Sequence, residues 1–471
     1  MPFSMSPDEF RAVAHQAVDW MADYLRDVRD YPVLPNVQPG ELIDRLPAAG
    51  PEQGVPMETI LEDFRKLIVP GITHWNHPRF FAYFSISASG PGILGEMLAA
   101  ALDVNQMLWK SSPAATELEQ VTLGWLRQWM GLPETFFGII HDTASTSSMH
   151  AILAARELAS PERRHTGHSA PLILYISEHT HSSVERGAIA VGIGRENVRH
   201  IEADAEFRMK PAALASAIEA DRRAGKQPFC VVATIGTTSS SSIDPLRQIA
   251  EIARLEGLWL HVDAAYGGAA AILEEYRSIL DGAELADSLV VNPHKLLLTP
   301  VDLSVLYTKR PEIMKQALSL EEMPPYLVRA QQERALNSSD YSLALGRRFR
   351  ALKLWFVLRY FGREGIAQVL RSHIRLAQLA AREIESDPRF ELAAPVPFSL
   401  VCFRYVGSDD ENRALLERVN STGRAFLSST VLKGRLVLRM AIGNIATNED
   451  DVRAVLELIR SSAPRATGSP A

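Results

Sequence analysis

The middle of the chain alternates short apolar runs with amphipathic helical patterns, and this alternation constrains the fold more than any other feature. The apolar runs cover residues 171–177, 229–236, 258–265 and 287–292. Strands that are apolar almost throughout are buried on both faces, which is typical of parallel sheets between two layers of helices. The sequence therefore predicts an α/β fold with a mostly parallel sheet flanked by helices. The helical patterns lie at residues 149–159, 211–225 and 245–257.

The C-terminal part of the chain follows a different pattern. A long amphipathic helix is predicted over residues 346–361, continuing after two glycines to about residue 386. The segments beyond it predict a small α+β domain with a mostly antiparallel sheet. Its predicted strands are 391–396, 400–406 and 435–442, and its predicted helices are about 411–420 and 448–461.

The N-terminal part is predicted to be helical and extended. A helix begins at Ser6-Pro7 and ends near residue 28, a Pro-rich passage follows, and a second helix covers about residues 57–69. The 471 residues exceed the roughly 250–300 at which a single core stops growing. We therefore predict three parts: an N-terminal segment (1–85), a large domain (86–365) and a small C-terminal domain (366–471).

Composition excludes several classes of protein. The formal net charge is −7, from 49 basic and 56 acidic residues, so nothing in it attracts nucleic acid. The two cysteines, Cys230 and Cys402, lie in apolar runs, which excludes a disulfide framework. The N-terminus lacks the pattern of a signal peptide, and no run approaches the roughly 18 apolar residues of a membrane span. The sequence predicts a cytoplasmic protein with no nucleic-acid or membrane partner.

Lys295 and Asp263 are the first candidate catalytic residues. Lys295 follows an apolar strand, and burial lowers the pKa of a lysine amine until it can form Schiff bases with aldehydes. Asp263 ends another apolar strand, where a carboxylate can cap a helix, pair with an arginine, or keep a heterocycle nitrogen protonated, as pyridoxal phosphate (PLP) requires. Ligands of open α/β sheets gather at the carboxyl ends of strands, so we expect both residues at one site.

Three further features are weaker when taken alone. Residues 142–148 place small and hydroxylated residues at the start of a helical pattern, which suits either phosphate binding or an ordinary cap. Residues 236–242 form a similar turn after a strand. His181 also follows a strand, and its imidazole is either structural or stacked on a flat cofactor. All three are predicted to lie at strand ends of the same sheet.

Seven segments carry a resemblance to a known family. Through them the chain resembles the group II PLP-dependent decarboxylases, specifically the aromatic-L-amino-acid decarboxylases, over about residues 6–460. The segments are residues 74–84, 111–119, 142–145, 181–185, 261–266, 292–295 and 345–355.

The resemblance implies a fold, a cofactor and an assembly. It implies PLP fold type I and a homodimer with shared active sites, in which the N-terminal segment wraps the partner. Lys295 would carry PLP as a Schiff base, Asp263 would pair with the pyridine nitrogen, and His181 would stack on the ring. The other implied cofactor-binding residues are Ala144, Ser145, Thr238, Ala265, Asn292 and His294.

The resemblance also implies a reaction and a substrate pocket. The reaction is decarboxylation of an aromatic L-amino acid (tryptophan, tyrosine, phenylalanine or DOPA type) to the aryl-ethylamine and carbon dioxide. Asn105 and Met107 would reach the pocket across the dimer interface. The implied pocket residues are Trp75, Tyr83, Phe84, Ile86, Asn105, Met107 and Gly346.

Two departures from the family pattern affect the pocket. Ile86 stands where family members often have a threonine, and the hydroxyl of Ser85 or Ser87 is the candidate replacement. Leu296 stands directly after the cofactor lysine, where family members usually have a tryptophan.

A third departure concerns the product. Ser338 falls where a loop tyrosine of the family reprotonates Cα, which leaves Tyr341 as the candidate proton donor. In family relatives, loss of that tyrosine is associated with oxygen-dependent decarboxylation–deamination to an aldehyde. An aromatic aldehyde synthase is therefore the alternative function.

Other classes fit less well. A nicotinamide-dependent dehydrogenase would need a glycine motif, and the nearest, at residues 192–197, lacks its third glycine. A catalytically silent PLP-fold protein would not need Lys295 and Asp263 together. A metal site would take its ligands from His179, His181, His261 and Asp263. The Lys295 cation beside these residues disfavours a bound metal ion.

Overall fold

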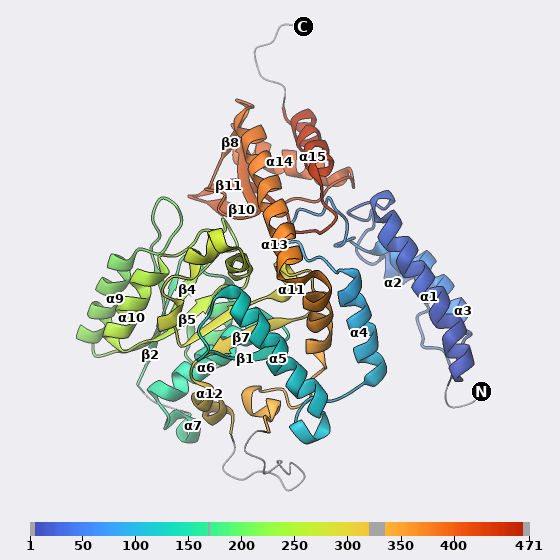
Figure 1. The fold of residues 1–471 in the computed structure, drawn as a ribbon. Helices are drawn as coiled ribbons and strands as arrows, with labels where there is room; N and C mark the ends of the chain where they lie inside the picture. The colour runs from blue at the N-terminus through green and yellow to red at the C-terminus, as the bar shows by residue number, and fades with distance from the viewer. Residues whose placement is uncertain (1–4, 168–169, 320–334, 465–471) are drawn as a thin grey trace.

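The centre of the molecule is a seven-stranded sheet (Figure 1). The structure is a computed structural model that describes residues 5–167, 170–319 and 335–464. The strands are β1 (Phe137–His141), β2 (Leu172–Ser177), β3 (Val198–Ile201), β4 (Gln227–Thr234), β5 (Trp259–Asp263), β6 (Ser288–Val291) and β7 (Ser304–Thr308). They are ordered β1-β7-β6-β5-β4-β2-β3, and β7 alone runs against its neighbours.

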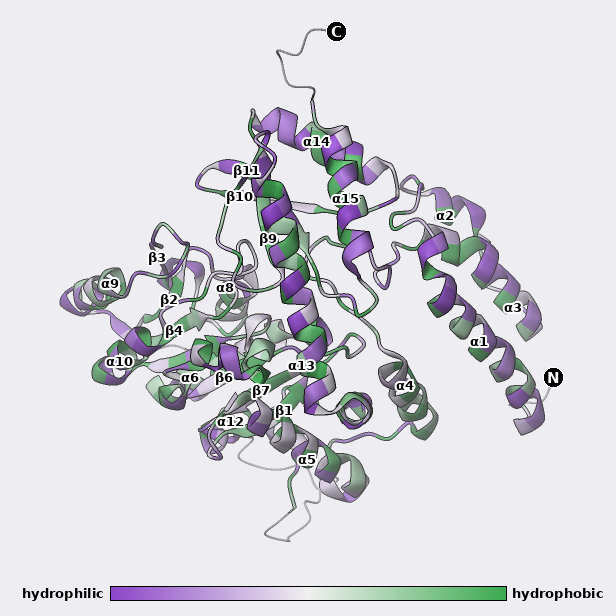
Figure 2. Ribbon diagram, turned by 45° about the horizontal axis from the view of Figure 1, so that its top comes forward, coloured by the Kyte–Doolittle hydropathy of each residue, from purple (hydrophilic) through white to green (hydrophobic). Residues whose placement is uncertain are grey.

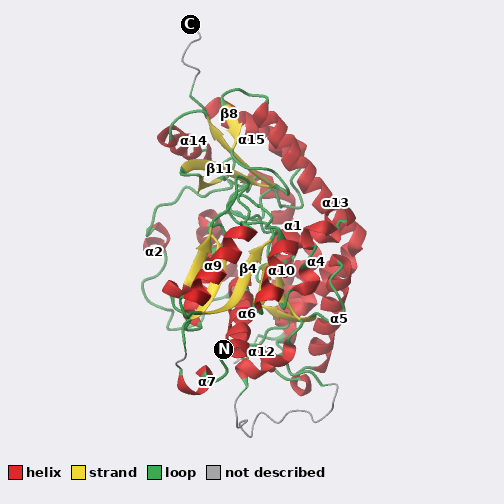
Figure 3. Ribbon diagram, turned by 90° about the vertical axis from the view of Figure 1, so that its left-hand side faces the viewer, coloured by secondary structure: helices red, strands yellow, loops and turns green. Residues whose placement is uncertain are grey.

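Helices cover both faces of this sheet (Figure 3). The side chains of β4 alternate between two cores: Cys230 and Val232 pack toward α6 and α8, while Val231 and Ala233 pack toward α5, α9 and α10. The predicted α/β fold with a mostly parallel sheet is confirmed. The helices are α5 (Pro113–Met130), α6 (Ala144–Ala159), α7 (Arg163–Thr166), α8 (Ser182–Ala190), α9 (Pro211–Arg223), α10 (Leu246–Glu256), α11 (Pro293–Leu296) and α12 (Pro311–Leu318).

A second, antiparallel sheet has its own core, as predicted for the C-terminal part. Its order is β10-β11-β9-β8. The long helix α13 (Arg350–Glu385) joins the two sheets (Figure 1) and is kinked at Gly362, where φ is 63°. The domain boundary predicted at residue 365 falls inside this helix. The remaining elements are β8 (Phe390–Leu392), β9 (Leu400–Tyr405), β10 (Ser428–Leu432), β11 (Arg435–Ala441), α14 (Asp409–Ser421) and α15 (Glu449–Ser462).

The N-terminal helices lie at the edge of the molecule, away from the large sheet (Figure 1). Ser6 caps the first helix, since its hydroxyl accepts a hydrogen bond from the backbone N–H of Glu9 at 3.1 Å. No residue of this helix is buried. None of the described helices is long and apolar enough to cross a membrane. These helices are α1 (Pro7–Asp27), α2 (Glu41–Arg45) and α3 (Met57–Asp63), whereas the next helix, α4 (Gly90–Leu102), packs against α13.

Some elements differ from the sequence-based expectation. β10 was not predicted, because its burial alternates and only one end reaches the core. The second helix is α-helical only to Asp63 and continues as a π-turn. The long helix begins at Arg350 rather than 346, because the backbone of Arg347 bonds to the Asn105 side chain and the Gln106 N–H instead. β1, β3 and β7 were also not predicted.

Asp451 anchors the N-terminal segment to α15. Its carboxylate is 1% exposed and binds the guanidinium groups of Arg29 and Arg79. The same side chain completes the capping box of α15 with Asn448. One buried carboxylate thus joins two parts of the chain that lie more than 400 residues apart.

Replacing Asp451 by asparagine should loosen this anchor. We expect Asp451→Asn to lower the free energy of unfolding by about 2 kcal/mol, because two charge-assisted hydrogen bonds lose their acceptor charge. Differential scanning calorimetry should show a fall of a few degrees in the apparent Tm. Asp450→Asn, at an exposed neighbour in the same helical turn, is the matched control. Equal melting of both variants would contradict the anchor.

Candidate active site

A cavity of about 330 Å³ lies at the carboxyl ends of three parallel strands. Thr234 ends β4, Asp263 ends β5, and Lys295 follows β6 on the short helix α11. The other lining residues come from the loops that follow these strands, from α11, from the second sheet, from the starts of α6 and α8, and from residues 75–86. The cavity is lined by Trp75, Tyr83, Phe84, Ile86, Thr143, Ala144, Ser145, His181, Ser183, Thr234, Gly236, Thr238, Asp263, Ala265, Tyr266, Asn292, His294, Lys295 and Arg439.

Lys295 and Asp263 share this cavity, as the sequence predicts. Burial lowers the pKa of the Lys295 amine, and the Asp263 carboxylate acts in the opposite direction. The Lys295 ammonium lies 5.0 Å from the ring centre of Phe84. One oxygen of Asp263 accepts a hydrogen bond from the backbone N–H of Ala265 at 3.1 Å, which fixes the carboxylate. The pair offers an amine nucleophile and an anion in one enclosed space.

The start of α6 has the properties of a phosphate site. The N-cap residue Thr143 makes no side-chain cap bond, so the first N–H groups of the helix keep their donor capacity. Ala144 and Ser145, which open the helix, both line the cavity.

Asn292 adds a further donor beside this helix end. Its amide nitrogen lies 3.3 Å from Nε2 of His294, and its Oδ1 accepts no hydrogen bond in this orientation. Nδ1 of His294 accepts from the backbone N–H of Leu303, so Nε2 carries the proton of the neutral ring. A protonated Nε2 pairs with an amide oxygen, which turns the NH₂ group of Asn292 toward the cavity. These groups fit the phosphate of PLP.

His181 lies at the N-terminus of α8 with a fixed ring. Its Nδ1 lies 2.7 Å from Oγ of Ser183 and accepts the backbone N–H of the same residue at 3.2 Å. Burial lowers the pKa of the imidazole, while Asp263 opposes this and Lys295 adds to it. A neutral, flat ring facing the cavity fits the stacking role that the resemblance implies.

Arg439 is a site residue that the sequence analysis missed. It lies on β11, is 3% exposed, and forms no ion pair with any carboxylate of the described chain. Nη1 donates to Oγ of Ser428 at 2.9 Å and Nη2 donates to the carbonyl of Thr238 at 2.7 Å. Nε has no partner in the structure. The sequence did contain a signal for this residue, an arginine inside the apolar strand RLVLRMAI. A buried cation without a counter-ion points to an anionic ligand.

Four predicted residues lie outside this cavity of the same chain. The ring of Tyr341 packs on Phe137 with 4.8 Å between centroids. The carbonyl of Met107 accepts from the N–H of Ser339, and Asn105 accepts from the N–H of Arg347 next to Gly346. Tyr341, Asn105, Met107 and Gly346 therefore belong to a neighbouring region, and their roles stay predictions.

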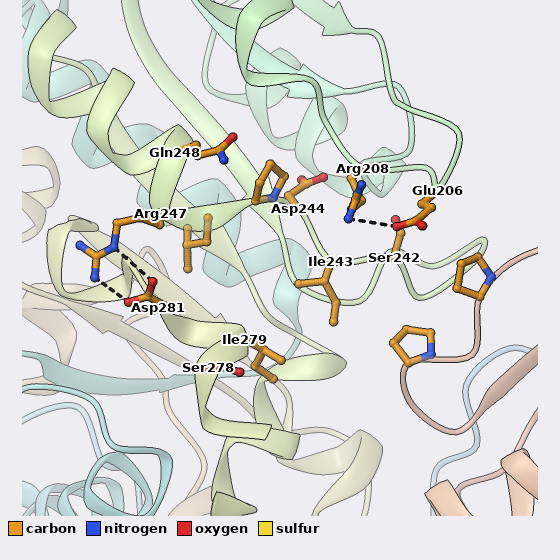
Figure 4. Close-up of a pocket in the computed structure, with 14 residues that line it drawn as sticks. Glu206, Arg208, Ser242, Ile243, Asp244, Arg247, Gln248, Ser278, Ile279 and Asp281 are labelled. Atoms are coloured by element: carbon orange, nitrogen blue, oxygen red, sulfur yellow. Dashed lines mark hydrogen bonds and ion pairs between the residues drawn. The ribbon is translucent and has the colours of Figure 1, made fainter. Parts of the chain in front are cut away.

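A second cavity, of about 460 Å³, lies between α10 and the loop at Pro395 and Pro397 (Figure 4). Its charged groups are paired with each other: Arg208 with Glu206, and Arg247 with Asp281. Both oxygens of the buried Asp244 accept backbone N–H groups. With its charges already satisfied, this cavity offers less to an ionic ligand than the Lys295 cavity.

The fold and the Lys295 cavity together define a PLP-dependent enzyme of fold type I. The pyridoxal-dependent decarboxylase conserved domain matches residues 39–406, and the chain belongs to this family, whose members are carboxy-lyases that use PLP. Tryptophan decarboxylase 2 of Oryza sativa subsp. japonica is 41% identical over 98% of this chain and 96% of its own length. Phenylacetaldehyde synthase of Arabidopsis thaliana is 40% identical, over 98% of this chain and 96% of its own.

A solved structure agrees with this assignment. The crystal structure of Oryza sativa TDC with PLP and tryptamine superposes with a TM-score of 0.93 at 37% sequence identity, covering 98% of both chains. The predicted fold class, family and cofactor are thereby confirmed. The role that the resemblance implies for each cofactor residue stays a prediction.

Replacing Lys295 should abolish covalent attachment of PLP. Wild-type protein reconstituted with PLP should show a visible absorption band, and reduction with borohydride should fix the cofactor on the chain. Lys295→Ala should lose both signals. Lys309→Ala is the control, because this amine lies outside the cavity and donates to the Glu284 carbonyl. A PLP adduct found by mass spectrometry on reduced Lys295→Ala protein would contradict the assignment.

Proposed function

We propose that the protein decarboxylates an aromatic L-amino acid, of the tryptophan, tyrosine, phenylalanine or DOPA type, to the aryl-ethylamine and carbon dioxide. The observation that carries this proposal is the cavity itself. It combines a lysine amine, a carboxylate, a phosphate cradle and the unpaired guanidinium of Arg439 with an aromatic wall. The relative named for tryptophan decarboxylation supports the same substrate class.

Lys295, Asp263 and His181 would act on the cofactor. PLP, when bound, supplies an acceptor for the electrons of the breaking bond between Cα and the carboxylate. Asp263 would keep the heterocycle nitrogen protonated, and the neutral His181 ring would hold the flat ring in place. The Lys295 amine, once released by the substrate amine, would stay in the cavity as a base and proton carrier.

Arg439 would bind the substrate carboxylate. The group that leaves is neutral carbon dioxide, so a stronger ion pair to the starting carboxylate stabilises the bound substrate more than the transition state. The guanidinium therefore contributes mainly binding and orientation. Holding the breaking bond at a fixed angle to the cofactor ring selects which bond of Cα breaks.

Aromatic side chains form the wall that would receive the substrate ring. Trp75 stacks on Phe80 at 4.3 Å and on Tyr83 at 5.6 Å between ring centroids. Phe426 meets both Phe80 and Tyr83 edge-on. Such a wall favours an aromatic substrate side chain over a charged one.

The active unit that we propose is a homodimer with shared sites. The exposed apolar residues Leu94, Leu98 and Leu102 on α4 support it, and Figure 2 shows α4 as a largely apolar helix. The N-terminal segment, 1–85, would wrap the partner, with 86–365 and 366–471 as the large and small domains. Asn105, Met107 and Gly346 would then serve the partner's cavity. A cytoplasmic location is part of the same proposal.

An aromatic aldehyde synthase is the second candidate function. Ser338 is buried at 1% exposure, and Tyr341 packs on Phe137, so neither side chain lines the cavity of its own chain. The chain is also similar to a relative named phenylacetaldehyde synthase, and this similarity supports the second candidate.

Product analysis separates the two functions. Purified protein with PLP should release amine and carbon dioxide in equal amounts from at least one of tryptophan, tyrosine, phenylalanine and DOPA. Chromatography should detect the amine, and a coupled assay should detect no hydrogen peroxide above a no-enzyme blank. Formation of peroxide and aldehyde in amounts equal to the carbon dioxide released would establish the aldehyde synthase instead.

Substitution of Arg439 tests the carboxylate site. Arg439→Gln should raise KM at least tenfold, since a charge-assisted hydrogen bond contributes about 1.5–3 kcal/mol and each 1.4 kcal/mol is tenfold. The decrease in kcat should be smaller, and the PLP absorption band should persist. Arg435→Gln, at an exposed position of the same strand, is the matched control. An unchanged KM in Arg439→Gln would remove the guanidinium from substrate binding.

A further inference from the structure

Two groups that line the Lys295 cavity meet at one hydroxyl. Oγ of Ser428 accepts the backbone N–H of Tyr83 at 3.0 Å and Nη1–H of Arg439 at 2.9 Å. Tyr83 and Arg439 both line the cavity, one in its aromatic wall and one as its unpaired cation. Ser428 thus connects the two sides that would hold opposite ends of the substrate.

The strand register brings Ser428 to this position. Ser428 of β10 lies directly opposite Arg439 of β11 in the antiparallel pair. Side chains directly opposite each other point to the same face of a sheet and lie close together. The hydroxyl therefore reaches the guanidinium without a change in the backbone of either strand.

Tyr83 has a strained backbone, and its N–H group is held by a side chain of the second sheet. Its φ is 52°, in the left-handed region that non-glycine residues rarely adopt. The residue is 53% exposed, and its ring packs on one side only, against Trp75 and Phe426. The bond to Ser428 ties this exposed residue to the second sheet.

Arg439 has few anchors for a buried cation. Besides Ser428, its only hydrogen-bond acceptor in the described part of the chain is the Thr238 carbonyl. The guanidinium carbon lies 5.4 Å from the ring centre of Phe84. This contact restrains one face of the guanidinium but does not fix its rotation within its own plane. Two acceptors at two different nitrogens fix that rotation, and loss of either one frees it.

We propose that Ser428 is a positioning residue that sets the distance between the carboxylate-binding guanidinium of Arg439 and the aromatic wall at Tyr83. Through this distance it selects substrates by the number of bonds between the carboxylate and the ring. The proposal rests on the proposed function, because it assumes an amino acid with a carboxylate and an aromatic ring.

The chemistry of the side chain makes the proposal specific. A hydroxyl oxygen has two lone pairs and accepts two hydrogen bonds at once. Threonine keeps this ability, a cysteine thiol keeps it only weakly, and alanine lacks it. Ser429 is the matched control, because it is the next residue on the same strand, is exposed and points to the other face.

The test measures kcat and KM for phenylalanine and for homophenylalanine, which is one methylene longer. Ser428→Ala should raise KM for phenylalanine about tenfold, the effect of losing one hydrogen bond to a charged group. Its preference for phenylalanine over the longer homologue should fall toward one. Ser428→Cys should lie between Ala and wild type. Ser428→Thr should stay within about twofold of wild type, and Ser429→Ala should match wild type.

A double-mutant cycle tests the route of the effect. In the Arg439→Gln background, Ser428→Ala should change KM much less than in the wild-type background, because the shared interaction is already gone. The PLP absorption band should be the same in all variants, which shows that the cofactor site is intact.

Two results would overturn the proposal. One is wild-type KM and chain-length preference in both Ser428→Ala and Ser428→Cys. The other is full additivity of Ser428→Ala with Arg439→Gln. Either result leaves the proposed decarboxylation in place, because that is judged from the wild-type product and from Arg439→Gln alone.

Discussion

The structure depends on enclosing three charged side chains, Lys295, Asp263 and Arg439, in one cavity. Removing a charge from water costs several kcal/mol unless opposite charges or hydrogen bonds replace the water. Asp263 supports the charged form of Lys295, while Arg439 is left with a hydroxyl and a carbonyl as its partners. The Arg439 guanidinium thus has no carboxylate of the described chain as its ion-pair partner. The cavity is therefore suited to anionic ligands, and both a phosphate and an amino-acid carboxylate meet that requirement.

A buried polar network keeps the elements of the cavity in register. His261 lies on β5, two residues before Asp263, and its Nε2 lies 3.0 Å from Oγ of Ser148 on α6. Its Nδ1 lies 2.9 Å from Oγ of Ser288 on β6, which also accepts Nε1–H of Trp259. Burial lowers the pKa of His261 to about 4, so the ring is neutral and both nitrogens take part in hydrogen bonds. The helix with the phosphate cradle and the strands before Asp263 and Lys295 are thus held by one imidazole.

The sequence predicted the parts of the site that follow directly from strand ends. Asp263 and Lys295 each follow an apolar run, and parallel strands bring such ends together whatever the details of the helices. Arg439 could not be placed in this way, because it comes from a second sheet whose position depends on α13 and its kink at Gly362. Tyr341 illustrates the opposite limit: the resemblance left it as the candidate proton donor, and its ring packs on Phe137 within its own chain.

The cavity is completed where the two sheets meet. The hydroxyl-rich turn at residues 236–242, uninformative in the sequence, makes this contact: Thr238 accepts from Arg439, the carbonyl of Ser239 accepts from the thiol of Cys402, and its hydroxyl accepts from Thr430. The position of the Arg439 guanidinium in the cavity therefore depends on how the small sheet sits on the large one. Tyr341, the candidate proton donor, lies in a different place, where its ring packs on Phe137 of β1. In the proposed function, recognition of the substrate carboxylate and the fate of the product would thus depend on separate parts of the chain.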